Sequence, residues 1–350
     1  MNHDEFLRRK YFPRLDGLRA VSILLVLTWH SNVAALKLLH GQAGVTVFFV
    51  ISGFIITTLL LREESNNGRA SLRSFYIRRV FRIFPLYYLA LLVFSLAVFA
   101  GFADDAGDYG LRLVHFLTYT NEFATDGTFG HSWSLAIEEK FYFIWPLLAF
   151  ATPALMRSRV WVGTGLLVVT FAIGLFLPDG YFGIYCPIIA GCVLAILAHN
   201  ARSYQLMSRT IARPAIALFL FALAVFAILA SPYGHVQVLA GIAVALAFPA
   251  LLFGDQWMGR WLEFKPLAYV GRRAYAIYLF HPLVGSALDV ALPPSTQVAW
   301  QVIHFVLMLA FSVVLAEVLY RVVEKPMIKI GHRLAGRSKE VKGVPSAAGV

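Results

Sequence analysis

Ten mainly apolar stretches, each about 20 residues long, follow one another along this sequence with short polar breaks between them. A helix rises about 1.5 Å per residue, so one such stretch is long enough to cross the hydrocarbon core of a bilayer. The stretches lie at residues 20–38, 43–61, 83–103, 131–151, 160–177, 182–199, 214–231, 235–253, 273–292 and 299–320. They predict an all-α polytopic membrane protein, a bundle of about ten transmembrane helices.

The composition agrees with this fold class. Hydrophobic residues make up 59% of the 350 residues and charged residues only 14%, whereas a soluble globular domain has about 45–50% and about 25%. A disordered chain, a soluble two-domain enzyme and a small disulfide scaffold are therefore excluded. We expect one membrane domain over residues 1–335, followed by a polar, basic and disordered tail over residues 336–350.

The basic residues are distributed unevenly between the two sides of the predicted bundle. With the N-terminus in the cytoplasm, 27 of the 30 lysines and arginines fall in cytoplasmic segments, and only Lys37, Arg112 and Lys140 fall elsewhere. This bias is the positive-inside rule, and it predicts that both termini are cytoplasmic. The net charge of +11 is thus explained by topology, and no nucleic-acid partner is predicted.

The first apolar stretch has a second interpretation, as a signal peptide that is cleaved near the pair Ala34-Ala35. Cleavage would leave the charge distribution as it is. It would remove the most polar group of residues in the apolar part of the sequence.

His30 is the first ionisable residue at predicted membrane depth. It follows Arg19 by eleven residues, which is ~16 Å along a helix. If Arg19 marks the cytoplasmic boundary, His30 lies near the middle of the membrane, where ionisable side chains are costly and usually functional. The alternative is a structural histidine that is hydrogen-bonded between helices.

The fourth apolar stretch begins with a second polar group, in which Glu138 and Glu139 point to adjacent faces of a helix. The predicted depth of Glu138 approaches that of His30. A neutral histidine can take a proton from a hydroxyl, and a carboxylate on its other ring nitrogen would orient it. We therefore predict a catalytic pair of His30 and Glu138. The alternative is a stabilising cluster with Lys140 at a water-filled vestibule.

Arg79 and Arg82 form the third group, at the cytoplasmic start of the third stretch. They are three residues apart, so they share one face of a helix. Two guanidinium groups on one face suit phosphate recognition. The alternative is an ordinary cytoplasmic anchor.

Several segments together resemble the motifs of the acyltransferase-3 family, a group of integral-membrane O-acyltransferases. The segments are RLDGLRA at 14–20 followed by the histidine at 30, GVTVFFVISGF at 44–54, FYIRRVFRIFP at 75–85, SWSLAIEEKFYFIWP at 132–146, YAIYLFHP at 275–282 and EKP at 324–326. They occur in order and with the expected spacing from residue 14 to residue 326. The middle of the chain, about 150–270, carries little signature.

The resemblance implies an enzyme of the bacterial inner (plasma) membrane that moves an acyl group, usually acetyl, from coenzyme A to a hydroxyl of a cell-surface or exported glycan. It implies His30 and Glu138 as catalytic residues, and Arg19, Arg79 and Arg82 as residues that bind acyl-coenzyme A. Supporting roles are expected for Asp16, for Trp133, Glu139 and His281, and for a small-residue turn at Ser52-Gly53. The expected partners are acyl-coenzyme A as co-substrate, a carbohydrate or lipid-linked glycan as acceptor, and membrane lipids. No bound cofactor or metal is expected.

Two other functions remain open from the residues alone. A proton-coupled transporter or flippase of a lipid-linked sugar would use His30, Glu138 and Glu139 as a proton relay. A scaffold for polysaccharide assembly would perform no chemistry. The series of motifs favours the enzyme.

Overall fold

The computed structural model describes residues 1–9, 11–102, 106–177, 181–211, 213–230, 235–254, 257–293 and 295–340. Within these residues every regular element is helical. The α-helices are α1 (His3–Arg8), α2 (Pro13–Trp29), α3 (Ala34–Lys37), α4 (Ala43–Asn67), α5 (Leu72–Phe99), α6 (Ala106–Leu117), α7 (Trp133–Phe150), α8 (Pro153–Phe176), α9 (Tyr185–His199), α10 (Ala201–Ile211), α11 (Pro214–Leu229), α12 (His235–Phe253), α13 (Trp257–Arg260), α14 (Lys265–Gly271), α15 (Ala274–Ala291), α16 (Val298–Leu319) and α17 (Lys325–Glu340).

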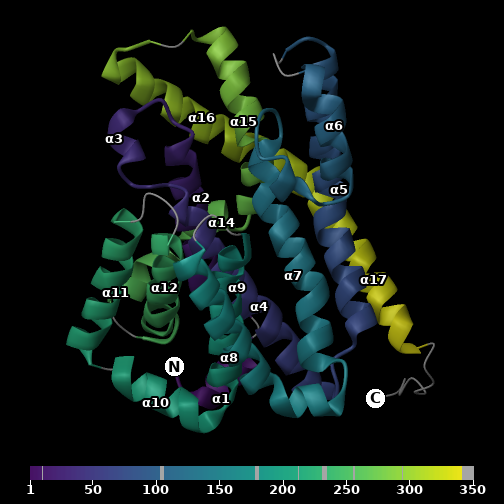
Figure 1. The fold of residues 1–350 in the computed structure, drawn as a ribbon, viewed down its shortest axis with the longest axis vertical. Helices are drawn as coiled ribbons and strands as arrows, with labels where there is room; N and C mark the ends of the chain where they lie inside the picture. Colours follow the sequence, from purple (N-terminus) through teal and green to yellow (C-terminus); the bar gives the residue numbers. More distant parts are fainter. Residues whose placement is uncertain are drawn as a thin grey trace.

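The molecule has two distinct ends (Figure 1). One end holds α1, α10 and the last turns of α17. We call it the basic end, because the end of α4, the connection after it and the start of α5 there carry Arg62, Arg69 and Arg73. The other end, which we call the distal end, holds α3 and α6. The positive-inside rule predicts that the basic end faces the cytoplasm.

Among the residues that the structure describes, six helices are long and apolar enough to cross a membrane by themselves, and a seventh span results if α10 and α11 count as one bent unit. The chain is therefore a multi-pass membrane protein, while the count of ten spans stays a prediction. Counted as single helices, α2, α7, α11 and α12 miss this standard, and α2 and α7 also carry charged side chains. The first, α2, has 17 residues and includes Arg14, Asp16 and Arg19, and α7 includes Glu138, Glu139 and Lys140. Charged side chains thus interrupt the apolar surface of two of the helices that carry candidate site residues.

The predicted first span, 20–38, is too long. The helix α2 ends at Trp29, and α3 is a separate turn of helix. Near the end of α2 the side chain of Ser31 donates a hydrogen bond to the carbonyl of Thr28, at 2.7 Å. Such side-chain bonds satisfy carbonyl groups that the helix leaves free at its end. The chain then folds back, and His30 becomes the residue that follows the last helical turn.

Glycines bring the central helices into close contact. A Cβ on Gly44 of α4 would lie 2.3 Å from the carbonyl oxygen of Ser22 in α2, and one on Gly53 would lie 1.9 Å from that of Ile188 in α9. Small residues allow helix backbones to approach in this way in membrane proteins. Ser52 and Gly53 lie inside α4, so no turn occurs there, and the close approach at Gly53 agrees with helix packing, the other explanation of this pair that the sequence allows.

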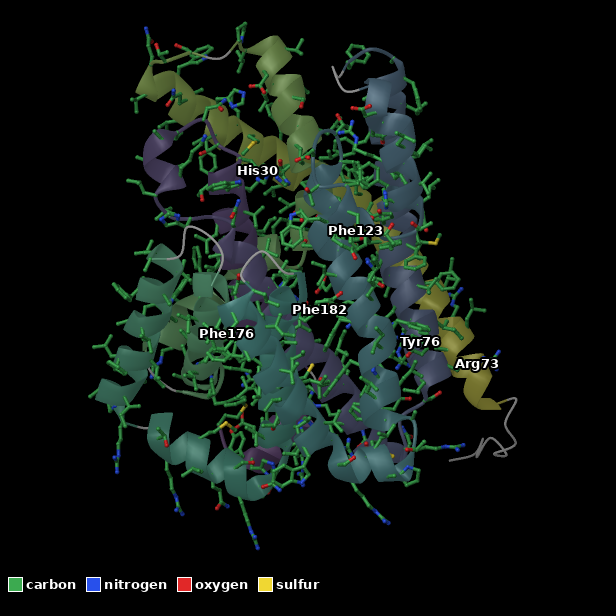
Figure 2. All side chains as sticks on the ribbon, in the orientation of Figure 1. His30, Arg73, Tyr76, Phe123, Phe176 and Phe182 are labelled. Carbon is green, nitrogen blue, oxygen red and sulfur yellow. The ribbon has the colours of Figure 1, made fainter. Side chains whose placement is uncertain are left out.

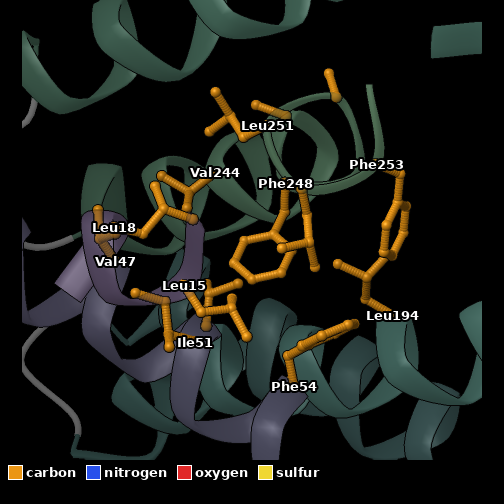
Figure 3. Close-up of a cluster of buried hydrophobic side chains, with 14 of the residues drawn as sticks. Leu15, Leu18, Val47, Ile51, Phe54, Leu194, Val244, Phe248, Leu251 and Phe253 are labelled. Atoms are coloured by element: carbon orange, nitrogen blue, oxygen red, sulfur yellow. The ribbon is translucent and has the colours of Figure 1, made fainter. Parts of the chain in front are cut away.

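The largest apolar cluster joins α2, α4, α9 and α12 beside the basic end (Figure 3). Its labelled members are Leu15, Leu18, Val47, Ile51, Phe54, Leu194, Val244, Phe248, Leu251 and Phe253. A second cluster packs α2 and α5 against α15 and α16. The helices α2 and α4 pack into these apolar clusters and also carry residues of the site described below. The packing of the core therefore fixes the position of the site.

The last span continues beyond its predicted end at residue 320. The helix α16 passes through one π-helical turn, Tyr320–Glu324, directly into α17. The first part of the predicted tail, residues 336–340, is therefore helical, and residues 341–350 lie outside the described residues. π-Helical turns occur frequently at functional sites, and this one directs attention to Glu324.

Candidate functional site

A cavity of about 380 Å³ lies between α2, α4, α5, α7, α15 and the π-helical turn, and we call it the arginine cavity. It collects seven residues that the sequence predicted for the site: Asp16, Arg19, Ser52, Arg79, Arg82, Glu138 and Glu139. A wider cavity of about 590 Å³ adjoins it, and both cavities share Arg19, Arg79 and Arg82 in their walls. The wider cavity also includes residues of the α4–α5 region at the basic end.

Arg79 and Arg82 differ from other arginines near the basic end. Arg78 forms an ion pair with Glu63 at 2.9 Å, and Arg159 pairs with Glu64 at 2.7 Å. Within the described residues no carboxylate lies in ion-pair range of Arg79 or Arg82. The guanidinium of Arg79 instead lies over the ring of Tyr142, 4.7 Å from its centroid. Two guanidinium groups with free donors remain at the wall of the cavity.

Asp16, which lies one turn earlier in α2, holds the side chain of Arg19. Asp16 is buried and accepts hydrogen bonds from Arg19 at 3.2 Å and from the hydroxyl of Tyr11 at 2.7 Å. The backbone at Asp16 is also packed tightly, because a Cβ on Gly271 would lie 1.8 Å from its carbonyl oxygen. Asp16 is thus a residue that positions Arg19.

Glu138 is 5% exposed and accepts hydrogen bonds from the hydroxyls of Ser52 and Tyr142. Tyr142 lies under the guanidinium of Arg79, so the carboxylate is linked through Tyr142 to the arginine. The predicted alternative partner of this region, Lys140, forms an ion pair with Glu122 instead. Glu138 consequently belongs to the arginine cavity.

A second, smaller cavity of about 180 Å³ lies toward the distal end, and we call it the histidine cavity. Its walls come from the end of α2, the start of α4, the start of α7 and α15 on one side and from α8, α9 and α12 on the other. They include His30, Gln42, Trp133 and Tyr278. Figure 2 shows His30 in the upper part of the molecule, whereas Arg73, at the start of α5, lies in the lower part. The helix α2 relates the two cavities, because it carries Arg19 of the arginine cavity near its start and His30 of the histidine cavity after its last turn.

The ring of His30 is oriented by the backbone of its own helix. Its Nδ1 lies 3.0 Å from the carbonyl oxygen of Val26. A carbonyl can only accept, so Nδ1 carries the proton in the neutral ring and Nε2 keeps a free lone pair. His30 is exposed to the cavity. It can therefore accept a proton there.

Two more histidines stand behind His30. The ring of His281, in α15, lies edge-on to His30 with 4.7 Å between the ring centroids, and His131 follows at 5.6 Å from His281. His281 is fully buried, and its Nε2 has no hydrogen-bond partner. In the described part of the chain no group of three or more His, Cys, Asp or Glu residues could hold a metal ion. The three rings thus form a packed cluster.

A narrow cavity of about 30 Å³ connects the walls of the two larger ones. It shares Val26 and Tyr278 with the histidine cavity, and Glu138 and Tyr275 with the arginine cavity. Neighbouring cavities that share wall residues therefore form a row from the basic end to His30.

The sequence left open whether His30 and Glu138 are in contact, and within the described residues no hydrogen bond joins them. Each has its own hydrogen-bond partners, which are Val26 for His30 and Ser52 and Tyr142 for Glu138. The carbonyl of Val26 occupies only Nδ1 of His30, and Nε2 stays free. The predicted supporting residues divide in the same way, with Trp133 in the wall of the histidine cavity and Glu139 in that of the arginine cavity.

Sequence reasoning missed several residues of the site. Tyr142 follows Glu138 by four residues on the same helix, and this spacing was a usable signal. Glu324 is 5% exposed, lines the arginine cavity and has one carboxylate oxygen without a partner. Tyr278 lies in the YAIYLFHP segment at 275–282, whose resemblance did not single it out, and Gln42 lies outside the quoted segments. Their roles follow only from the way the helices pack.

Comparison with known proteins places these residues in a family context. A family model described as an acyltransferase domain matches residues 12–317. The putative peptidoglycan O-acetyltransferase YrhL of Bacillus subtilis is 30% identical to this chain, over 94% of the chain and 56% of the relative. The peptidoglycan O-acetyltransferase OatA of Listeria monocytogenes is 29% identical, over 92% and 57%.

A putative O-acetyltransferase of Staphylococcus aureus is 26% identical, over 93% of this chain and 59% of the relative. The chain thus spans somewhat more than half the length of these curated relatives. No solved structure matches the chain.

Proposed function

Because the chain belongs to the acyltransferase-3 family, we propose that it transfers an acyl group, acetyl in the first instance, to a hydroxyl of a carbohydrate acceptor such as a cell-surface or exported glycan. Two of its relatives are named as peptidoglycan O-acetyltransferases, one of them as a putative one, which supports a glycan acceptor. The location that fits this activity is a bacterial inner (plasma) membrane.

The donor is acyl-coenzyme A, which enters at the basic end. The support is the pair of unpaired guanidinium groups on Arg79 and Arg82, since Arg binds phosphate through two parallel hydrogen bonds. Arg19, held by Asp16, adds a third positive charge to the same wall. The extended pantetheine arm then carries the thioester along the row of cavities toward His30.

The transfer needs one base and no covalent intermediate on the protein. Nε2 of His30 takes the proton of the acceptor hydroxyl while the hydroxyl oxygen attacks the thioester carbon. The carbon–sulfur bond breaks, the new ester forms, and the thiolate leaves. The imidazolium then returns the proton to the thiolate, so the products are an O-acyl sugar and coenzyme A.

Glu138 acts on the donor side in this scheme. Its carboxylate holds Tyr142, and the ring of Tyr142 supports the guanidinium of Arg79. Glu138 is therefore a positioning residue of the arginine cavity. The observation that carries the whole proposal is the row of cavities from two unpaired arginines to a histidine with a free Nε2.

The experiment is transfer of labelled acetyl from acetyl-coenzyme A to glycan in membranes that contain the full chain, with His30→Ala beside it. We expect label in the glycan fraction with the unchanged chain and loss of transfer with His30→Ala at equal expression. Full transfer by His30→Ala would refute the catalytic assignment. Sugar movement that follows a proton gradient and ignores coenzyme A would instead establish the transporter or flippase, with His30, Glu138 and Glu139 as relay.

A further inference from the structure

Three polar groups in the wall of the histidine cavity have no partner within the described residues. They are the amide of Gln42, the hydroxyl of Thr46 and the indole N–H of Trp133. Other polar groups of the same wall are occupied: Nε2 of His131 lies 3.2 Å from the carbonyl of Leu279, and the hydroxyl of Tyr278 lies 2.8 Å from that of Ser134. The free groups surround His30, which lines the same cavity.

Polar groups that stay unpaired in a partly enclosed cavity indicate a ligand or water that completes them. The amide of Gln42 both donates and accepts, the hydroxyl of Thr46 does the same, and the indole of Trp133 donates. A polyhydroxyl ring offers hydroxyls that match all three. The broad apolar face of the indole also suits the C–H face of a pyranose.

The charge of the cavity narrows the ligand class. Among the residues the structure describes, its wall carries no lysine, arginine, aspartate or glutamate. A carboxylate or phosphate on the ring would lose its water there without gaining a partner, which is costly. The arginine cavity, with Arg79 and Arg82, provides the opposite environment.

The size of the histidine cavity restricts the class of ligand further. About 180 Å³ is below the ~300–1,000 Å³ of pockets that enclose drug-sized ligands. It fits one ring and leaves the remainder of a larger glycan outside.

We propose that the histidine cavity is an acceptor subsite for a single uncharged pyranose ring, held by Gln42, Thr46 and Trp133 so that one hydroxyl meets Nε2 of His30. The inference rests on the proposed function, because it concerns the acceptor of the same reaction. Beyond that function, the inference names the residues that select the acceptor, and it states that acidic sugar rings are excluded.

The first test is kinetic and uses the full chain in membranes with acetyl-coenzyme A. The acceptors are a methyl glucoside, a methyl N-acetylglucosaminide and a methyl glucuronide. We expect transfer to a neutral glycoside and poor use of the glucuronide. Gln42→Leu should raise the KM for the neutral acceptor about 5- to 100-fold, because it removes a hydrogen-bonding partner. Its KM for acetyl-coenzyme A should change less than about twofold.

Gln205→Leu is the matched control, because Gln205 is exposed on α10 at the basic end and lines neither cavity. Thr46→Val should act in the same direction as Gln42→Leu, with a smaller effect. Equal use of glucuronide and neutral glycosides would overturn the proposal. An unchanged acceptor KM in both Gln42→Leu and Thr46→Val would overturn it as well.

The second test measures binding without chemistry, so that it stands even if no transfer is seen. The purified chain in lipid nanodiscs is titrated with the same three glycosides while the saturation-transfer NMR signal of the sugar is followed. Signal for a neutral glycoside that Gln42→Leu weakens and Gln205→Leu preserves supports the subsite, even where the proposed transfer fails. Equal signal for all variants, or none for the unchanged chain, overturns the subsite and leaves the acyl transfer to be judged by the labelled-acetyl experiment.

Discussion

The arginine cavity and the histidine cavity lie on one row and differ in size and in charge. The first holds about 380 Å³ with four arginines, three glutamates and one aspartate in its wall, and the second about 180 Å³ with uncharged groups and histidines among the described residues. A charged, phosphate-bearing molecule is therefore favoured at the basic end and an uncharged one toward the distal end. The difference separates the two substrates before they meet.

One helix sets the spacing between the two cavities. Asp16 and Arg19 lie near the start of α2, and His30 follows its last turn. A helix is rigid, so the ~16 Å between Arg19 and His30 is fixed by the backbone. Because α2 ends at Trp29, its two ends contribute to different cavities, and the helix joins them.

The largest expected effect is the loss of kcat when only the histidine cavity is changed. His30→Ala should lower kcat for acetyl transfer by about 10²- to 10⁴-fold, because it removes the only proposed base. The KM for acetyl-coenzyme A should stay near its original value, since the arginine cavity is intact. Labelled-acetyl kinetics in membranes measures both quantities. His115→Ala, the same change on α6 outside both cavities, is the control, and an equal loss there would show that the effect is not specific to His30.

The next effect is a rise in the KM for the donor when only the arginine cavity is changed. Arg79→Ala with Arg82→Ala should raise the KM for acetyl-coenzyme A by about 10- to 100-fold or more, because hydrogen bonds to charged groups contribute about 1.5–3 kcal/mol each. The KM for the glycan should stay unchanged in this double variant. Arg73→Ala changes an exposed arginine of the same helix that lines neither cavity, and it serves as the control. An unchanged donor KM in the double variant would mean that the two arginines are membrane anchors.

The sequence was sufficient for the parts of the molecule that depend on local pattern. Apolar stretches indicated helices because burial in lipid requires them, and the spacing of Arg79 and Arg82 indicated a shared helix face, which the structure confirms for one cavity wall. The family resemblance is also confirmed. These features depend on neighbours along the chain.

The parts that could not be predicted depend on packing between distant segments. The end of α2 at Trp29 is set by side-chain bonds within its last turn and by the return of the chain at Gly41, whose Cβ would lie 2.0 Å from the carbonyl of Leu25. That one boundary places the ring of His30 beside the carbonyl of Val26. Pattern gives the depth of a residue in the membrane and does not give the direction in which its ring points.

A third prediction tests which cavity Glu138 serves. Tyr142→Phe removes one hydrogen bond to this carboxylate and leaves the ring under Arg79 in place. We expect kcat/KM for acetyl-coenzyme A to fall about tenfold, with the acceptor KM unchanged. Ser52→Ala should give a similar, independent loss through the other hydrogen bond. A loss confined to the acceptor KM would assign Glu138 to the histidine side and restore the predicted pair with His30.

The smallest effect concerns the packing that holds the arginine side in place. Gly271→Ala would put a Cβ 1.8 Å from the carbonyl oxygen of Asp16, so α14 must move away from α2. Overpacking of this kind costs about 1–3 kcal/mol, and the thermal unfolding midpoint of the purified protein should fall. Gly110→Ala is the control, because a Cβ on this exposed glycine of α6 meets nothing within 4 Å. Since Asp16 positions Arg19, Gly271→Ala should also raise the donor KM a few-fold while the acceptor KM stays constant, and a shift of both constants together would mean that the two cavities are not independent.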